Sequence, residues 1–207
     1  MCAKISFSDW QMALIEEINQ GRLDDPTCDV WGCEAAVTLR RAIKEFGIKS
    51  QNNTCCYCKE INYSDSHKVW EVEHVLPLSD YVQFAFEPLN LAISCPDCNT
   101  AKSNKKVSNT KAKKAVPTRS ALYFIVHPHI DSYNEHIKKI GLFFYPKSKK
   151  GRKTIETCGL LRLAEKYVDW ENLEEVERIE AEAKALQGNG CNRDKIKGLI
   201  SDLESLL

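Results

Sequence analysis

The sequence lacks any long apolar run. Among its 207 residues, the longest uninterrupted apolar stretch is the six residues 121–126, whereas a helix that spans a membrane needs about 20. The first residues also lack the basic stretch, apolar segment and small-residue cleavage site of a secretory signal peptide. With 43% apolar residues the chain can build a core, so we expect a globular, cytoplasmic protein without membrane contact.

A net charge is also lacking, because 29 lysines and arginines balance 29 acidic residues. The balance conceals a segment, 101–120, with seven basic residues and no acidic one, and a second basic stretch at 147–153. Such blocks can bind a polyanion, and we expect them to contact DNA, although a block standing alone would more simply be a solvated surface. Strong unaided DNA binding usually goes with a positive excess, so neutrality favours a protein that acts with a partner.

Cysteine, in contrast, is abundant, with ten residues. In a reducing compartment, cysteines in CxxC pairs indicate a metal site rather than disulfides. Four thiolates form the tetrahedral shell that zinc accepts, and no position then remains for a substrate, so we predict a structural zinc ion. The predicted ligands form two pairs with 36 residues between them: Cys55 and Cys58, then Cys95 and Cys98.

Two other cysteine arrangements are weaker. Cys56 also precedes Cys58, but CxC is a poorer ligand spacing, so we leave Cys56 out of the site. Cys28 and Cys33 offer a second site only as a minor alternative.

The residues between the two pairs have the order that a one-metal phosphodiesterase needs. Glu73 and His74 end a short β-like run, and Asn99 directly follows the second pair. A neutral imidazole can take a proton from water near pH 7. Carboxylate and amide oxygens suit a hard divalent cation, which would stabilise the charge on a leaving oxygen. Lys102 lies one helical turn after Asn99, where it can reach a neighbouring phosphate.

At these residues the sequence resembles HNH endonucleases of the four-cysteine subtype. The pattern reads CCYC at 55–58, EVEHVLP at 71–77 and NLAISCPDCNTAKSNK at 90–105. The resemblance implies a zinc-stapled ββα-metal finger that cleaves DNA and leaves 5′ phosphate and 3′ hydroxyl ends. Asn99 stands where many members have histidine, and Glu73 where aspartate is also frequent.

The resemblance also implies roles for single residues. His74 is then the general base, and Glu73 with Asn99 binds the catalytic Mg²⁺ or Mn²⁺ ion. Asn90 would hold the loop before the second cysteine pair and orient His74. The basic residues at the end of the motif would contact nucleic acid: Lys102, Lys105 and Lys106.

A second concentration of ligand types follows the finger, at His127, His129, Asp131 and His136. These residues form either a second metal site or, as we prefer, a structural elbow around Pro128 in which the histidines hydrogen-bond within the packed protein. The layout from here to Ile155 loosely resembles Septu-type and retron-associated HNH proteins. That resemblance implies an effector in anti-phage defence, with an ATPase or sensor protein as its partner.

The expected fold class is α+β and mostly helical, with the zinc-stapled ββα-metal finger embedded between helical segments. We place an N-terminal helical segment at 1–50, the finger at 51–107, and a basic linker with a mostly helical region at 108–207. Two N-terminal helices should close at Gly21 and Gly47, since glycine favours helix ends. Further helices are expected at 159–187 and 192–207.

The leading functional hypothesis is an endonuclease that hydrolyses DNA. A single finger cuts one strand, so a double-strand break would need a second copy of the chain, in a homodimer, or successive nicks. The alternatives are a non-catalytic zinc module that binds nucleic acid or a protein, and a nuclease that stays inactive until a partner releases it.

Overall fold

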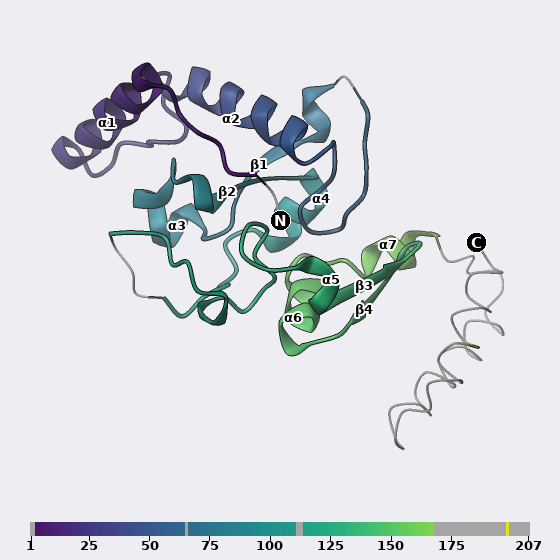
Figure 1. Ribbon diagram of the computed structural model, residues 1–207. Helices are drawn as coiled ribbons and strands as arrows, with labels where there is room; N and C mark the ends of the chain where they lie inside the picture. The colour runs from purple at the N-terminus through teal and green to yellow at the C-terminus, as the bar shows by residue number, and fades with distance from the viewer. Residues whose placement is uncertain (1–2, 65, 111–113, 168–197, 199–207) are drawn as a thin grey trace. The chain divides into compact units, whose positions relative to one another are not determined.

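The computed structural model describes residues 3–64, 66–110, 114–167 and 198 (Figure 1). The chain divides into two compact units, one made of Met1–Lys138 with Phe144–Leu160 and the other of Lys139–Phe143 with Leu161–Leu207. All of the candidate site residues belong to the first unit. Among the described residues, no helix has the length and apolar character needed to cross a membrane. The predicted three-part domain division stays a prediction.

Two helices open the chain, α1 (Asp9–Asp24) and α2 (Ala36–Ser50). The start of α1 is fixed by the side chain of Gln11, whose Oε1 accepts a hydrogen bond from the backbone N–H of Ser8. The prediction that the helices close at Gly21 and Gly47 was wrong, because both helices continue for three more residues. At Gly47 the reason is packing: a Cβ atom there would collide with the side chain of Ile93, so glycine allows close approach and does not end the helix.

The centre of the first unit is a β-hairpin followed by a helix. Strand β1 (Glu71–His74) pairs antiparallel with β2 (Leu91–Ser94), with Glu71 opposite Ser94 and His74 opposite Leu91. Helix α4 (Pro96–Lys102) follows β2 directly and contacts β1. The long connection between the strands contains the short helix α3 (Leu78–Tyr81). This ββα arrangement, set among helices, confirms the predicted fold class.

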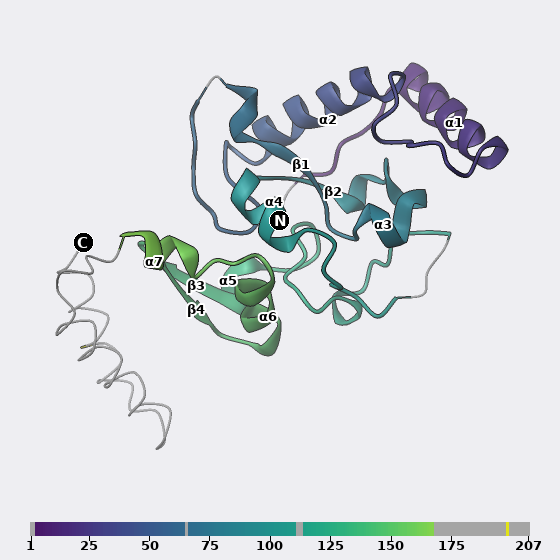
Figure 2. The ribbon, with the colours of Figure 1, turned by 180° about the vertical axis from the view of Figure 1, so that it is seen from behind.

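The N-terminal helices and the hairpin share one core. Helix α2 packs along both strands, as the two opposite views show (Figures 1 and 2). The core joins α1, α2 and the connection between the strands through eight buried side chains: Ile18, Val30, Ala36, Leu39, Ile43, Ala85, Phe86 and Leu91. At about 25 cal/mol for each Å² of apolar surface removed from water, such burial is a main source of stability. The hairpin is therefore not free-standing but depends on α1 and α2.

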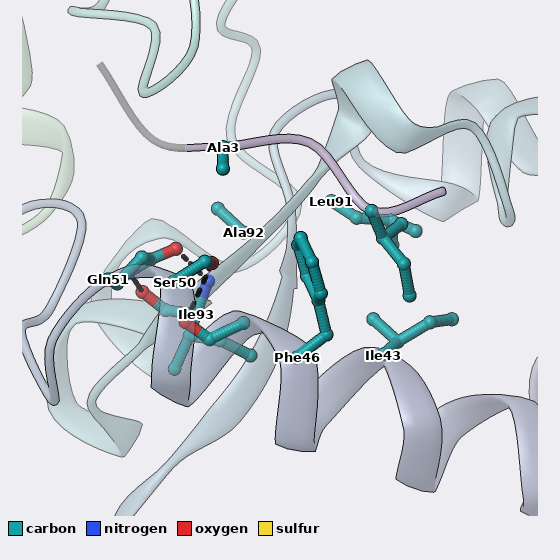
Figure 3. A pocket seen from close by; sticks show the side chains of 10 residues that line it. Ala3, Ile43, Phe46, Ser50, Gln51, Leu91, Ala92 and Ile93 are labelled. Atoms are coloured by element: carbon teal, nitrogen blue, oxygen red, sulfur yellow. Dashed lines mark hydrogen bonds between the residues drawn. The ribbon is translucent and has the colours of Figure 1, made fainter. Parts of the chain in front are cut away.

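A side chain from the end of α2 completes the edge of β2. The amide of Gln51 donates a hydrogen bond to the carbonyl of Ile93 and accepts one from the N–H of the same residue, each at 2.8 Å. Figure 3 shows this pairing beside a small hollow lined by Phe46 and Ile43 from α2 and by Leu91 from β2. The Gln51 amide thus satisfies the Ile93 N–H, which the edge of the sheet would otherwise leave unpaired, and it shares the Ile93 carbonyl with the N–H of Cys56.

The second half of the chain contributes short elements. They are α5 (Tyr133–His136), β3 (Ile137–Ile140), β4 (Phe143–Pro146), α6 (Lys149–Thr157) and α7 (Arg162–Tyr167), with β3 and β4 forming a two-stranded sheet. Gly159 has a φ of 59° and lies just beyond α6, so it follows the end of one helix instead of beginning the predicted one. The rest of the helix predicted at 159–187, beyond α7, and nearly all of the helix predicted at 192–207 lie outside the described residues.

Candidate active site and metal centre

The four predicted zinc ligands come together at the base of the hairpin. Cys55 and Cys58 lie in a tight turn that is closed by a hydrogen bond from the N–H of Cys55 to the carbonyl of Glu60. Cys95 precedes α4, and Cys98 lies within its first turn. The four sulfur atoms lie within 4.8 Å of one another, so the four cysteines are positioned to bind a metal ion.

The sulfur geometry fits a tetrahedral ion. With metal–sulfur bonds of about 2.3 Å, neighbouring sulfurs of a tetrahedron lie about 3.8 Å apart. The Sγ atoms of Cys58 and Cys95 are separated by 3.9 Å, which matches that distance and is far longer than a disulfide bond of about 2.05 Å. Among the described residues this is the one group of three or more such ligands, and it includes neither Cys56 nor the pair Cys28 and Cys33.

His74 ends β1 with its ring inside the protein. Its Nε2 lies 2.9 Å from the carbonyl oxygen of Ala85. A carbonyl can only accept, so Nε2 carries the hydrogen, and in the neutral ring the lone pair is on Nδ1. Burial lowers the pKa of His74 to about 4; the Ala85 carbonyl opposes that shift and the charge of Lys102 adds to it. The ring is therefore neutral at pH 7, as proton abstraction requires.

Asn90 holds the connection between the strands in a defined shape. Its Oδ1 accepts a hydrogen bond of 2.7 Å from the N–H of Leu76, and its Nδ2 donates to the carbonyls of Leu76 and Phe84. These contacts lie two residues after His74 and one residue before Ala85, the residue that anchors its ring. Asn90 is fully buried, so its three hydrogen bonds satisfy the side-chain amide and stabilise this connection.

Glu73 is buried in an ion pair. Its Oε1 lies 2.6 Å from Lys102 Nζ and accepts a hydrogen bond of 2.9 Å from the hydroxyl of Tyr57. Burial raises the pKa of Glu73, while Lys102 and the Tyr57 hydroxyl act in the opposite direction. Lys102 also donates to the carbonyl of His74, at 2.8 Å. The amine expected to contact a phosphate is thus held inside the protein, with 1% of the residue exposed.

Asn99 makes its hydrogen bond to a different carboxylate. Its Nδ2 donates to Glu71 Oε2 at 2.6 Å. Glu73 and Asn99 nevertheless line one hollow together with His74 and Trp31. The structure therefore brings the predicted base and both predicted ligands to one place, with the two ligands bonded to separate partners. Of the other predicted contacts, Lys105 donates to the carbonyl of Thr157, and Lys106 is exposed.

The comparison with protein families decides what this segment is. Residues 55–105 match the model of the HNH endonuclease family. They contain both cysteine pairs, the β1–β2 hairpin and α4. This segment is an HNH domain.

Two curated proteins resemble a longer part of the chain than the HNH domain. The Septu protein PtuB of Bacillus thuringiensis is 31% identical over 134 residues, which cover 65% of this chain and 44% of that protein. Protein ea31 of Escherichia phage lambda is 27% identical over 84 residues, covering 41% of this chain and 23% of that protein. The chain thus matches less than half the length of each of these relatives.

Two residues at the HNH domain could not be identified from the sequence. Trp31 precedes α2, outside the matched segment, yet its indole meets the His74 ring edge-on at a centroid distance of 4.4 Å. Tyr57 lies between Cys55 and Cys58, and its hydroxyl donates a hydrogen bond to Glu73. Both contacts join residues far apart in sequence, so no local pattern reports them.

The histidine-rich segment after the HNH domain is tied to the rest of its unit by hydrogen bonds. His129 Nε2 donates to the carbonyl of Leu91 in β2 at 2.6 Å, and the Tyr133 hydroxyl donates to the carbonyl of Tyr57. Asp131 accepts hydrogen bonds from the His127 N–H and from Lys150 Nζ. In the described part of the chain these side chains form no group of three metal-ligand atoms, which favours the elbow over a second metal site.

Proposed function

We propose that this protein is a metal-dependent endonuclease that hydrolyses DNA phosphodiester bonds, with His74 as the general base. The observation that carries the proposal is the hydrogen bond between His74 Nε2 and the Ala85 carbonyl. It fixes the tautomer and leaves Nδ1 as the basic nitrogen of a ring that lines an open hollow.

The chemistry assigned to His74 is the activation of water. Nδ1 takes a proton from a water molecule, and the resulting hydroxide attacks phosphorus. The bond from phosphorus to the 3′ oxygen breaks, and that oxygen gains a proton from solvent, leaving 5′ phosphate and 3′ hydroxyl ends. Because burial lowers the pKa of His74 to about 4, the imidazole is neutral and its Nδ1 carries no proton throughout the neutral range.

Glu73 and Asn99 are the residues that fit a catalytic Mg²⁺ or Mn²⁺ ion. Their carboxylate and amide oxygens are the donors such ions prefer, and both side chains line the His74 hollow. The described contacts of Glu73 are made to Oε1 and that of Asn99 to Nδ2, so Oε2 and Oδ1 are the atoms assigned to the cation. When bound, the cation supplies electrostatic stabilisation of the charge on the leaving oxygen.

Asn90 and Lys102 are assigned positioning roles. Asn90 fixes the connection that carries Ala85, and therefore the ring of His74. Lys102 binds the Glu73 carboxylate and the backbone carbonyl of His74, so it sets both residues relative to α4. Lys105 and Lys106, at the end of the domain, remain proposed contacts to nucleic acid.

We assign zinc to the four-cysteine group and give it a structural role. Four thiolates fill the tetrahedral shell, and the site joins the turn at 55–58 to the start of α4. Binding of such an ion contributes on the order of 10 kcal/mol of apparent folding free energy. The ion would thereby hold α4, with Asn99 and Lys102, against β1.

The biological role we propose is that of an effector in anti-phage defence. Its support is the likeness to the Septu protein PtuB, together with the loose resemblance of the segment from His127 to Ile155. An ATPase or sensor protein is the partner class this role implies. Cells that carry the native locus should resist phage, and the same locus with His74→Ala should not; equal resistance would contradict the role.

The test of the activity is plasmid nicking with Mg²⁺ or Mn²⁺, using native protein, His74→Ala and a matched control, Ser79→Ala. Ser79 lines the same hollow but has no assigned role. Loss of a general base should lower the rate about 10²–10⁴-fold, while Ser79→Ala should stay within about twofold of native. Equal nicking by native protein and His74→Ala would reject the proposal.

The second candidate is a nuclease that needs a partner to become active. It is favoured by the contacts of Glu73 with Lys102 and of Asn99 with Glu71, which engage both proposed cation ligands within the protein. This version predicts little nicking by the purified chain and His74-dependent nicking once the partner is added. A non-catalytic zinc module predicts no His74-dependent nicking under either condition.

A further inference from the structure

The hollow at His74 continues into a second hollow that lies against α2. The first is lined by His74, Glu73 and Lys102, and the second by basic side chains of α2. Both are lined by Trp31, Val72 and Asn99, so the two hollows meet at these three side chains. A chain-like molecule that crosses the His74 hollow on this side must therefore pass along α2.

The wall contributed by α2 is a rigid basic stripe. Val37, Arg40, Arg41 and Lys44 occupy positions i, i+3, i+4 and i+7, which form one face of a helix. A neighbouring face of α2 is buried in the core through Ala36, Leu39 and Ile43, which fixes the orientation of the helix.

The stripe has an excess of positive charge. It presents three cations, and Glu71 is the one acidic residue in the lining of this hollow. Arg41 is bonded to Glu45, but the pair is solvent-exposed, with 80% of the Arg41 side chain accessible. Water and salt screen an exposed pair of this kind, so Arg41 can exchange Glu45 for a phosphate at little cost.

We propose that this face of α2, named the α2 stripe (Arg40, Arg41 and Lys44), binds the sugar-phosphate backbone of the nucleic-acid strand beside the scissile phosphate. The inference rests on the proposed function. It assigns substrate binding to a helix that lies outside the HNH domain, and it places Trp31 at the junction, where an indole can contact a base or sugar of the crossing strand.

A nucleic acid suits this surface better than an acidic protein does. The stripe leads into the hollow where a phosphodiester is proposed to react, so one ligand accounts for both surfaces. Several lysines of the basic segments identified in the sequence already contact other residues of the protein: Lys102 is buried on Glu73, the exposed Lys105 donates to Thr157, and Lys150 pairs with Asp131. The α2 stripe then supplies cations next to the site, and arginine in particular pairs with phosphate through two hydrogen bonds.

The test measures binding separately from cleavage. Each variant is made in the His74→Ala background, and its affinity for a short fluorescent duplex and for the matching single strand is measured by anisotropy over a range of salt concentrations. The double variant Arg40→Gln/Lys44→Gln removes two cations of the stripe. The matched control, Lys4→Gln/Lys49→Gln, removes the same charge from one position before α1 and one on α2 outside the stripe.

The stripe variant should bind DNA about tenfold more weakly than its parent at physiological salt. The slope of log affinity against log salt concentration should become shallower by the equivalent of about two phosphate contacts. The control should stay within about twofold. Thermal unfolding checks that the core is intact. If the double variant is less stable, the single change Arg41→Gln decides the question, because that exposed side chain can be truncated without touching the core; we expect about threefold weaker binding.

Equal DNA binding by the stripe variant and the control would overturn the inference. So would a stripe variant that keeps its DNA affinity but loses an acidic protein partner. Either failure is distinct from failure of the proposed function, which is judged by cleavage with and without His74 and not by affinity.

Discussion

The ammonium group of Lys102 and the carboxylate of Glu73 form an ion pair of 2.6 Å inside the HNH domain, with 2% and 1% of the two side chains exposed. Lys102 lies on α4 and Glu73 on β1, so the pair joins the helix to the strand that carries His74. A buried ion pair contributes little net stability while intact, but loss of one partner is costly because the other charge stays buried.

Replacing Lys102 by methionine, which keeps the length of the side chain, should therefore destabilise the protein by about 3–5 kcal/mol. The measurement is the free energy of unfolding from denaturant titration. Lys106→Met, at an exposed position, should change it by less than about 0.5 kcal/mol. Adding Glu73→Gln to Lys102→Met should recover much of the lost unfolding free energy. A Lys102→Met variant as stable as native protein would show that the ion pair is not formed.

The cysteine group should hold about one zinc ion per chain. Cys98→Ser removes a ligand, so metal analysis should find that the ion is lost and circular dichroism should show that the HNH domain no longer folds stably, since on the order of 10 kcal/mol of apparent folding free energy goes with the metal. Cys28→Ser, outside the group, should keep the ion. Retention of zinc by both variants would be inconsistent with the assigned ligand set.

Ser103 offers a stabilising substitution. Its backbone has φ 46° and ψ −134°, a conformation that glycine adopts readily and other residues rarely do. Ser103→Gly should raise the stability by about 1 kcal/mol, because relief of strain exceeds the added entropy of the unfolded chain. Ser103→Ala keeps a Cβ atom and should give no such gain. Differential scanning calorimetry compares the melting temperatures, and equal values for the glycine variant and native protein would argue against strain at this position.

His127 should make the protein sensitive to acid. Burial lowers the pKa of His127 to about 3, with His129 and Lys150 acting in the same direction and Asp131 against it. The unfolded chain binds a proton near pH 6.5 and the folded chain does not, so stability is full above pH 6.5 and falls as the pH approaches 3.

Between pH 7 and pH 4 this single group should cost on the order of 3 kcal/mol. His127→Asn removes the titrating ring, so its unfolding free energy should decline less over that range than the native value does. The comparison uses denaturant titrations at several pH values. Parallel pH profiles for the two proteins would mean that His127 is not held neutral in the folded state.

The parts of the site that sequence could predict are those defined by short spacings. The two CxxC pairs, the adjacent Glu73 and His74, and Asn99 beside Cys98 are local patterns, and the structure gathers them around one hairpin and helix. The end of α2 was missed because glycine can either end a helix or let a neighbouring side chain approach closely. At Gly47 the close approach of Ile93, a contact between distant segments, decides between them.

Other features depend on which distant residues become neighbours. Lys102 has the spacing of a phosphate-binding lysine, but its burial follows from the packing of α4 on Glu73. Trp31 lies in a loop without any motif, and its contact with His74 exists because α1 and α2 share a core with the hairpin. The basic stripe of α2 was missed for a different reason. The first fifty residues as a whole carry more acidic than basic side chains, so their net charge does not indicate a basic surface.

The most direct test of the account is chemical rescue of the base. His74→Gly removes the imidazole, and single-turnover cleavage of a labelled DNA duplex with Mn²⁺ is measured with and without added imidazole, together with the partner if the purified chain needs one. We predict that the variant loses at least about 10²-fold in rate, keeps its zinc, and regains part of the rate as imidazole is added. Cleavage by His74→Gly at the native rate, without imidazole, would contradict the account.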